Sequence, residues 1–510
     1  MIAVLKSTPQ QGGPAMGAYL PDFNLVLPEL FLLSIAFLLL IEGVFRKTIE
    51  PSHLHRFGHI AFFSLIIALI ILSLITHPAG RVISFEGQLI QDDFVYLAKI
   101  LILTGTAAVL GISHMAMMKE HLLCFEYFPL VLIATVGMLL MVAANNFLSL
   151  FMGLEMQGLA LYVLATFEQN QKTTSEAALK YFILGAIATC LYLYGVSLMY
   201  GFSGSLNFEI LAHIIHIESI QSLPFGVFVG LIFIIAALSF KISVVPFHMW
   251  TPDVYQGCPT PITAFIAATP KVAAMLVLLR LMVVPFITLC GIWQSLVVFL
   301  SIASMIWGAF AALRQTNIKR LLAYSAIGQM GYVLMGVAAG NNEGVQGVFL
   351  YLTLYLIMIV GTFGCLLCLR GKGNSGVQDI EDLSGIASLH PRIAFALALF
   401  MFSLAGIPPL AGFFAKMYVF KAALSAGLFG LAVVGALTSV VAAYYYLRIV
   451  KVMYFDEMPD VSSLSYGHTV TLSYEAAIIL NICTLVTLFF FLFPTPLFTL
   501  IQQAAFILPG

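Results

Sequence analysis

The sequence predicts an all-α membrane protein that crosses the lipid bilayer about fourteen times. Of its 510 residues, 61% are hydrophobic and 9% are charged, and the mean hydropathy is +1.04. Soluble domains carry about 25% charged residues. The chain also contains fourteen separate apolar segments, each close to the roughly 20 residues that a helix needs to cross the hydrocarbon core. We therefore expect a polytopic protein in direct contact with the bilayer.

The apolar segments are joined by short connections, which leave no room for a large domain outside the membrane. The longest connections are His77–Asp93, Phe202–Phe225, Arg370–Arg392 and Met453–Tyr474. The fourteen spans are expected near 24–44, 59–76, 94–113, 122–142, 145–166, 176–201, 226–248, 262–285, 292–313, 318–339, 345–369, 393–419, 425–452 and 474–497.

The two faces of the membrane differ in their basic residues. Thirteen lysines and arginines lie in or beside the connections that follow spans 1, 3, 5, 9, 11 and 13, and three lie on the other face. Cytoplasmic loops carry an excess of lysine and arginine. The loop Arg370–Arg392 should therefore be inside and both termini outside, as an even number of spans requires.

Two proline-containing spans indicate an internal symmetry. Pro246 in span 7 and Pro408–Pro409 in span 12 lie about 162 residues apart, each near a lysine, Lys241 or Lys416. Proline interrupts a helix because it lacks a backbone donor. Spans 4–8 and 9–13 would form two inverted five-helix repeats, each with one broken helix, as in many transporters. The expected division is 1–121 for spans 1–3, 122–288 and 289–452 for the repeats, and 453–510 for span 14.

Ionisable side chains within the apolar spans are candidates for a polar path through the membrane. Each costs about 3 kcal/mol or more at bilayer depth, so such residues usually serve a function. The candidates are Glu155, Lys180, Lys241, Lys271, Lys416 and His248. Burial favours the neutral form of an amine and a nearby carboxylate favours its charged form, so a lysine under both influences can bind and release a proton. This is the chemistry of a proton relay.

Structural alternatives remain for some ionisable residues. Glu155 and Lys180, on consecutive spans, could form a buried ion pair that only fixes helix packing. His248 could instead donate a hydrogen bond to a loop carbonyl. Lys99 and Arg280 lie near span ends, so we expect their side chains to extend to the membrane interface.

Several other functions find no support in the sequence. The net charge is −1 and there is no long basic tract, so we expect no nucleic-acid partner. Cys365 and Cys368 lie inside an apolar span and are interpreted as packed core thiols. The sets His53, His55 and His59, and His213 with His216, are interpreted as belonging to solvated loops rather than metal sites. Without a nucleotide-binding motif or a cysteine cluster, the chain itself should bind no nicotinamide, flavin, ATP, iron–sulfur centre or metal.

Three stretches resemble a known family. They are FKISVVPFHMWTPDVYQGCPTPITAF at 240–265, QTNIKRLLAYSAIGQMGYVLMG at 315–336 and FSLAGIPPLAGFFAKMYVF at 402–420. They resemble the antiporter-like subunits of proton-translocating NADH:quinone oxidoreductase, respiratory complex I. The run WTPDVYQG followed by PTP resembles the subunit N family, called subunit 2 in mitochondria, in particular. The resemblance is dense over spans 4 to 13 and looser outside them.

The resemblance implies a fold and roles for the candidate residues. The family has fourteen helices with two inverted repeats. Glu155 and Lys241 would be the central pair of the first half-channel, with Lys180 beside them. Lys271 would connect the two halves and Lys416 would serve the second half-channel. Many relatives carry histidine where this chain has Gln329. A glutamine side chain cannot take up a proton at ordinary pH, so a relay through this position would need water or a neighbouring group.

The resemblance also implies partners and a membrane. NADH, FMN, iron–sulfur clusters and quinone would be bound in other subunits, and this chain would contact a neighbouring antiporter-like subunit and small quinone-side subunits. We expect the bacterial cytoplasmic (inner) membrane, with the mitochondrial inner membrane as the alternative. An Mrp-type secondary cation/proton antiporter subunit is the alternative function, because the same lysines and broken helices would serve it.

Overall fold

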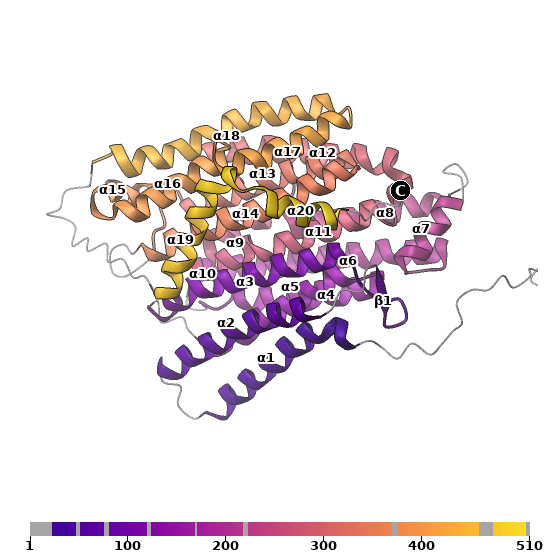
Figure 1. Ribbon diagram of the computed structural model, residues 1–510, viewed down its shortest axis with the longest axis horizontal. Coiled ribbons are helices and arrows are strands. Elements are labelled where there is room, and N and C mark those ends of the chain that lie inside the picture. The colour runs from indigo at the N-terminus through magenta and orange to yellow at the C-terminus, as the bar shows by residue number, and fades with distance from the viewer. Residues whose placement is uncertain are drawn as a thin grey trace, which may run out of the picture.

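The computed structural model describes residues 23–46, 51–75, 81–119, 124–168, 171–217, 223–369, 376–457 and 473–505. These residues form a bundle of helices that lie side by side (Figure 1). The α-helices are α1 (Leu27–Phe45), α2 (Pro51–Leu74), α3 (Asp93–Lys119), α4 (Tyr127–Ala143), α5 (Phe147–Ala165), α6 (Lys172–Ser203), α7 (Phe208–Ile217), α8 (Phe225–Ile242), α9 (Trp250–Gly257), α10 (Thr260–Ala267), α11 (Thr269–Val283), α12 (Cys290–Leu313), α13 (Ile318–Ala339), α14 (Asn342–Cys368), α15 (Ile386–Leu389), α16 (Pro391–Ala405), α17 (Ala411–Ser425), α18 (Phe429–Phe455), α19 (Tyr474–Phe489) and α20 (Thr495–Ala504).

The helices confirm a polytopic membrane protein. Among the described residues, 12 helices are long and apolar enough to cross a membrane. Two further expected spans fall short of that length: α4 has 17 residues, and the span expected at 393–419 is divided into α16 and α17. The count of fourteen spans and the two inverted repeats therefore stay predictions.

Helices are interrupted at both proline positions. α8 ends at Ile242 and α9 begins at Trp250, with Pro246 between them. α16 ends at Ala405 and α17 begins at Ala411, after Pro408 and Pro409. A third interruption, which the sequence analysis did not predict, separates α10 from α11 at Ala268. Each interruption leaves backbone groups without partners in their own helix.

Two connections contain structure that the sequence analysis missed. The connection His77–Asp93 carries an antiparallel hairpin of β1 (Val82–Ser84) and β2 (Leu89–Gln91). The Asn145 amide donates to the Gln88 carbonyl at 2.9 Å, which ties the hairpin to the start of α5. The connection Phe202–Phe225 contains the short helix α7. Among the described residues, the regular structure is therefore helical apart from one hairpin whose two strands have three residues each.

The centre of the bundle is formed by α10, α11, α13 and α14, whose apolar stretches are almost wholly enclosed. α1 and α2 lie at the edge of the bundle (Figure 1), and only 39% of the apolar stretch of each is buried. Large apolar side chains are exposed on α1, α2, α6 and α18, as expected for surfaces that face lipid. The arrangement places Lys271 of α11 and Gln329 of α13 in the interior.

Candidate functional site

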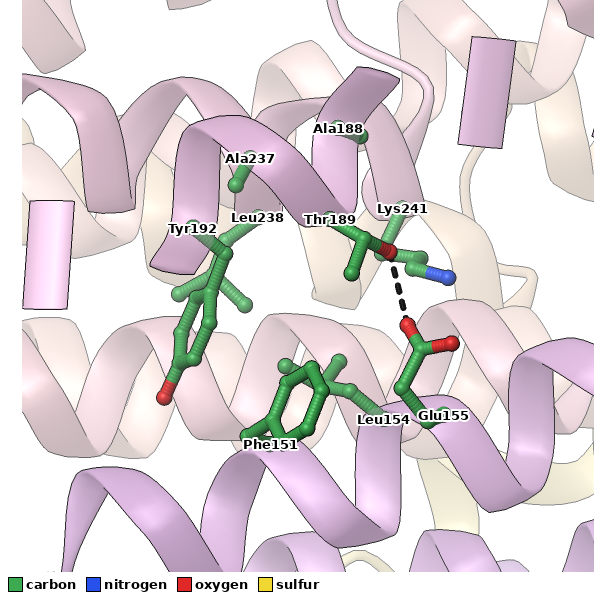
Figure 2. Close-up of a pocket in the computed structure, with 9 residues that line it drawn as sticks. All are labelled: Phe151, Leu154, Glu155, Ala188, Thr189, Tyr192, Ala237, Leu238 and Lys241. Atoms are coloured by element: carbon green, nitrogen blue, oxygen red, sulfur yellow. Dashed lines mark hydrogen bonds between the residues drawn. The ribbon is translucent and has the colours of Figure 1, made fainter. Parts of the chain in front are cut away.

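Glu155 and Lys241 line one small cavity between α5, α6 and α8. The cavity encloses about 10 Å³, at the lower limit for one water molecule. Figure 2 shows the Glu155 carboxylate and the Lys241 side chain on the same side of the cavity. The Thr189 hydroxyl donates to Glu155 Oε1 at 2.6 Å, and Lys241 Nζ donates to the Tyr162 hydroxyl at 3.3 Å. Within the described part of the chain, neither Glu155 nor Lys241 is in an ion pair.

Lys180 does not lie in that cavity. Its side chain is 44% exposed, and its Nζ pairs with Asp253 Oδ2 at 2.8 Å and Glu176 Oε1 at 2.7 Å. The alternative in which Lys180 and Glu155 form a buried ion pair is therefore wrong. The cause is that Asp253, on the α9 side of the broken helix, offers Lys180 a carboxylate that the sequence analysis did not consider.

Asp253 connects the two expected repeats. Besides Lys180 from α6, it accepts a hydrogen bond from Arg320 Nη1 of α13 at 2.7 Å. The same guanidinium donates to Gln256 at 3.0 Å. The short helix α9 is thus held between α6 and α13 by charged groups at its own start.

Lys271 is completely enclosed in the first turn of α11. Its exposed fraction is 0%, and Nζ has no hydrogen-bond partner among the described residues. The amine lies 5.0 Å from the centroid of the Tyr255 ring, whose hydroxyl is also buried without a partner there. The first turn of a helix is an unfavourable place for a cation. The ring face of Tyr255 offers the amine an attractive contact.

Lys416 lies in the second broken helix and donates to groups that the break provides. Its Nζ donates to the Ala405 carbonyl at 2.9 Å and to Ser439 Oγ at 2.8 Å, and it lies 4.8 Å from the centroid of the Tyr332 ring. Ala405 is the last residue of α16. Its carbonyl is free to accept because the last carbonyls of a helix have no partner within it.

Gln329 is held by three neighbouring elements. Its Nε2 donates to the Leu404 carbonyl at 3.1 Å and to the Tyr446 hydroxyl at 3.0 Å, while the Tyr351 hydroxyl donates to its Oε1. Leu404 and Ala405 are consecutive, so Gln329 and Lys416 bond to adjacent carbonyls. The amide therefore lies beside the Lys416 site, in a chain of buried tyrosine hydroxyls.

His248 lies in the break between α8 and α9. Its ring centroid is 5.8 Å from that of Trp307, and its buried Nδ1 lacks a hydrogen-bond partner in the described part of the chain. The structure does not bring His248 into hydrogen-bond contact with Lys241 or Lys271. Its inclusion in the relay stays a prediction without a contact to support it.

Lys99 and Arg280 do not extend to the membrane interface as the sequence analysis expected. Lys99 Nζ pairs with Glu29 Oε1 at 2.7 Å, with side chains 1% and 3% exposed. Arg280 Nη2 pairs with Asp92 Oδ2 at 2.8 Å and is 3% exposed. Each buried charge is instead compensated by a carboxylate from another segment, so the structural role expected of both residues agrees with these pairs while the extension to the interface does not.

Most of the neutral polar groups of the site were not predicted from the sequence. Tyr162, Tyr255 and Tyr332 each lie against a candidate lysine. The Thr189 hydroxyl donates to Glu155, and the Ser439 hydroxyl accepts from Lys416. Tyrosines inside apolar spans were the available signal, since a buried hydroxyl usually finds a partner. In an apolar helix they also fit ordinary packing, and so the pattern alone was not decisive.

The histidine and cysteine sets considered as metal sites all lie on helices. His53, His55 and His59 lie on α2, and His213 and His216 lie on α7, rather than in the loops that were expected. Cys365 and Cys368 are buried inside α14, as expected for core thiols. Within the described residues, no group of three or more His, Cys, Asp or Glu side chains is arranged to hold a metal ion.

Comparison with known proteins relates the chain to one family. Residues 144–442 match the transmembrane family described as NADH:quinone oxidoreductase/Mrp antiporter. NADH-quinone oxidoreductase subunit N of Parvibaculum lavamentivorans is 47% identical over 485 residues, which cover 95% of this chain and 97% of that protein. The chain belongs to the NADH-quinone oxidoreductase subunit N family. This relation confirms the family resemblance of the three stretches quoted above, and bacterial relatives agree with the expected inner-membrane location.

Two solved structures share the fold of this subunit N family member. A chain of respiratory complex I from Thermus thermophilus, solved with bound aureothin, is 29% identical, covers 92% of this chain and 98% of its own, and superposes with a TM-score of 0.76. A chain of the Mrp complex from Dietzia sp. has a TM-score of 0.80 but 21% identity, covering 96% and 98%. The second similarity shows the fold alone, so the sequence relation favours complex I over the Mrp alternative.

Proposed function

We propose that the chain moves protons across the membrane as subunit N of an NADH-quinone oxidoreductase. Electron transfer from NADH to quinone takes place in other subunits, which bind NADH, FMN, iron–sulfur clusters and quinone. This chain, a translocase subunit without a redox centre of its own, couples to that reaction through its buried ionisable groups. Its partners are the neighbouring membrane-arm subunits, including an antiporter-like subunit and the small subunits on the quinone side.

The observation that carries the proposal is the contrast between two kinds of cation within the bundle. Lys99 and Arg280 are each compensated by a carboxylate. Within the described part of the chain, the buried Lys271 and Lys416 and the half-buried Lys241 are in no ion pair with a carboxylate and contact tyrosines instead. A permanently charged, uncompensated amine inside a membrane protein is costly. An amine that exchanges its proton avoids that cost during part of each cycle.

The contacts suggest how a proton would travel. Glu155 and Lys241 face one cavity, where a single water would join the carboxylate to the amine. Lys271, in the centre of the bundle and beside the Tyr255 ring, would receive the proton from this first cavity. Tyr351, Gln329 and Tyr446 then form a hydrogen-bonded chain toward the Lys416 site. Gln329 takes part as a donor and acceptor rather than as a proton carrier.

Proton pumping by the whole complex tests this function. The complex is reconstituted in vesicles with Glu155→Gln or Lys241→Met, and quinone reduction and proton uptake are measured together. Both variants should assemble, because neither residue takes part in an ion pair within the described part of the chain, and both should lose coupled pumping.

The matched control removes an amine from the surface. Lys421→Met takes away a lysine that is 66% exposed and pairs with Glu343 at 3.0 Å. It should pump as the wild type does, because an exposed pair contributes little. Wild-type pumping by assembled Lys241→Met complex would refute the proposed function of the first cavity.

A further inference from the structure

We propose that a groove between α1 and α2 binds an anionic phospholipid, with the phosphate at its basic end and an acyl chain along its apolar end. The groove, here called the α1–α2 groove, encloses about 540 Å³. This volume lies within the range of roughly 300–1,000 Å³ that ligand pockets occupy. The inference does not rest on the proposed proton path, since no relay residue lines the groove.

The lining of the groove changes from polar to apolar along its length. One face of α2 contributes residues that recur every three or four positions from Ser52 to Ile67, about 22 Å of helix. Its first half supplies Ser52, His55, Arg56 and His59. The second half, with the facing part of α1, supplies Ile60, Phe63, Ser64, Ile67, Phe31 and Ile35. A lipid has the same division into a polar head and an apolar chain.

The polar end offers one exposed guanidinium to an anion. Arg46 and Arg56 both donate to Glu42 Oε1, so this cluster of two guanidinium groups and one carboxylate carries a net charge of +1. Arg56 is 50% exposed and keeps donors for a further anion. Among the described residues, a second carboxylate reaches this end, where Glu475 Oε1 lies 2.9 Å from His59 Nδ1, so Arg56 is the group on which headgroup binding depends.

The polar end lies where the apolar stretches of two candidate spans end, which is where a lipid headgroup would be expected. It is formed by the end of α1 and the start of α2, where the two helices meet the connection that the distribution of basic residues predicts to be cytoplasmic. Basic pockets between transmembrane helices on this side favour anionic headgroups. The exposed position of α1 and α2 at the edge of the bundle (Figure 1) leaves the groove open to the bilayer.

Photolabelling of the whole complex tests the site. The complex is reconstituted in phosphatidylcholine vesicles with traces of phosphatidylglycerol or phosphatidylcholine that carry a diazirine on one acyl chain, and labelled peptides are located by mass spectrometry. Phosphatidylglycerol should label α2 around Phe63 and Ile67 about fivefold more than phosphatidylcholine. That ratio corresponds to about 1 kcal/mol for one basic side chain near an anionic headgroup. Excess inorganic phosphate should not compete, because it lacks the acyl chain.

Two variants and one control separate headgroup binding from general contact with the bilayer. Arg56→Gln should reduce phosphatidylglycerol labelling to the phosphatidylcholine level, and Ile35→Trp, which fills the apolar end, should reduce labelling by both. Arg81→Gln, which alters an exposed arginine paired with Glu209 on the other face, should change neither. Equal labelling by the two lipids, labelling unaffected by Arg56→Gln, or cross-links to a protein subunit in place of lipid would each overturn the proposal.

Discussion

Replacing Lys416 with arginine separates the charge of this residue from its ability to exchange a proton. Arginine keeps the positive charge and can donate to the Ala405 carbonyl and Ser439 Oγ, which accept from Lys416 at 2.9 and 2.8 Å. It does not release its proton at ordinary pH. A positioned proton donor or acceptor contributes about 100- to 10,000-fold to a transfer step. Proton flux that passes through Lys416 should therefore fall about 100-fold or more.

The structural cost of the change is set by the packing of the side chain. A Cβ on Gly406 would lie 2.9 Å from Lys416 Cδ, so the lysine stem rests directly on that glycine and the larger guanidinium must displace its surroundings. Lys416→Met is therefore needed beside Lys416→Arg. It keeps a similar volume and leaves the two acceptors without their donor, at about 1–3 kcal/mol each.

The assay is proton uptake by vesicles containing the purified complex, measured together with its thermal unfolding midpoint. Lys421→Arg, on the same helix and 66% exposed, is the matched control and should behave as the wild type. Both Lys416 variants should remain assembled and lose proton flux. Normal flux in the arginine variant would show that the residue only balances charge and would refute the reasoning.

Three further predictions concern contacts found in the structure. Lys99→Met should destabilise the protein by about 3–5 kcal/mol, because it leaves Glu29 as a buried uncompensated charge. Adding Glu29→Leu should recover most of this loss, and equal thermal midpoints for the single and double variants would contradict the prediction. In a double-mutant cycle of unfolding, Asp253→Asn and Arg320→Gln should give an interaction energy of about 0.5–1 kcal/mol. Additive effects on the free energy of unfolding would show that this pair does not join α9 to α13. Gln329→Leu should lower the thermal midpoint by removing three hydrogen bonds, with only the Tyr446 hydroxyl keeping a second partner in Ser325 among the described residues; an unchanged midpoint would show that the amide network is unimportant.

The broken helices could be predicted from the sequence because their cause is local. Pro246 and Pro408 fall within long apolar segments, where a proline removes a backbone donor and kinks or breaks the helix. The interruption at Ala268 was missed, since Pro270 in the second position of a new helix looks the same in sequence as a proline within a continuous one. The hairpin in the connection His77–Asp93 was missed because six residues of strand leave too short a pattern to recognise.

The positions of the buried lysines could be predicted, but their partners could not. An isolated charge in an apolar span is visible in the sequence, as for Lys271. Which carboxylate reaches a given amine depends on contacts between distant segments. Lys99 meets Glu29 across 70 positions and Lys180 meets Asp253 across 73, and no local pattern encodes either pair. The distinction between paired and uncompensated cations is therefore a property of the fold.

The ratio of protons pumped to electrons transferred in vesicles containing the Lys271→Met complex tests the central claim most directly. Lys271 is fully enclosed, has no hydrogen-bond partner among the described residues, and connects the two halves of the proposed path. Methionine preserves much of its volume and removes only the amine. The account predicts an assembled complex whose ratio falls below that of the wild type and of Lys421→Met. A ratio equal to the wild-type value would contradict proton transfer through this residue.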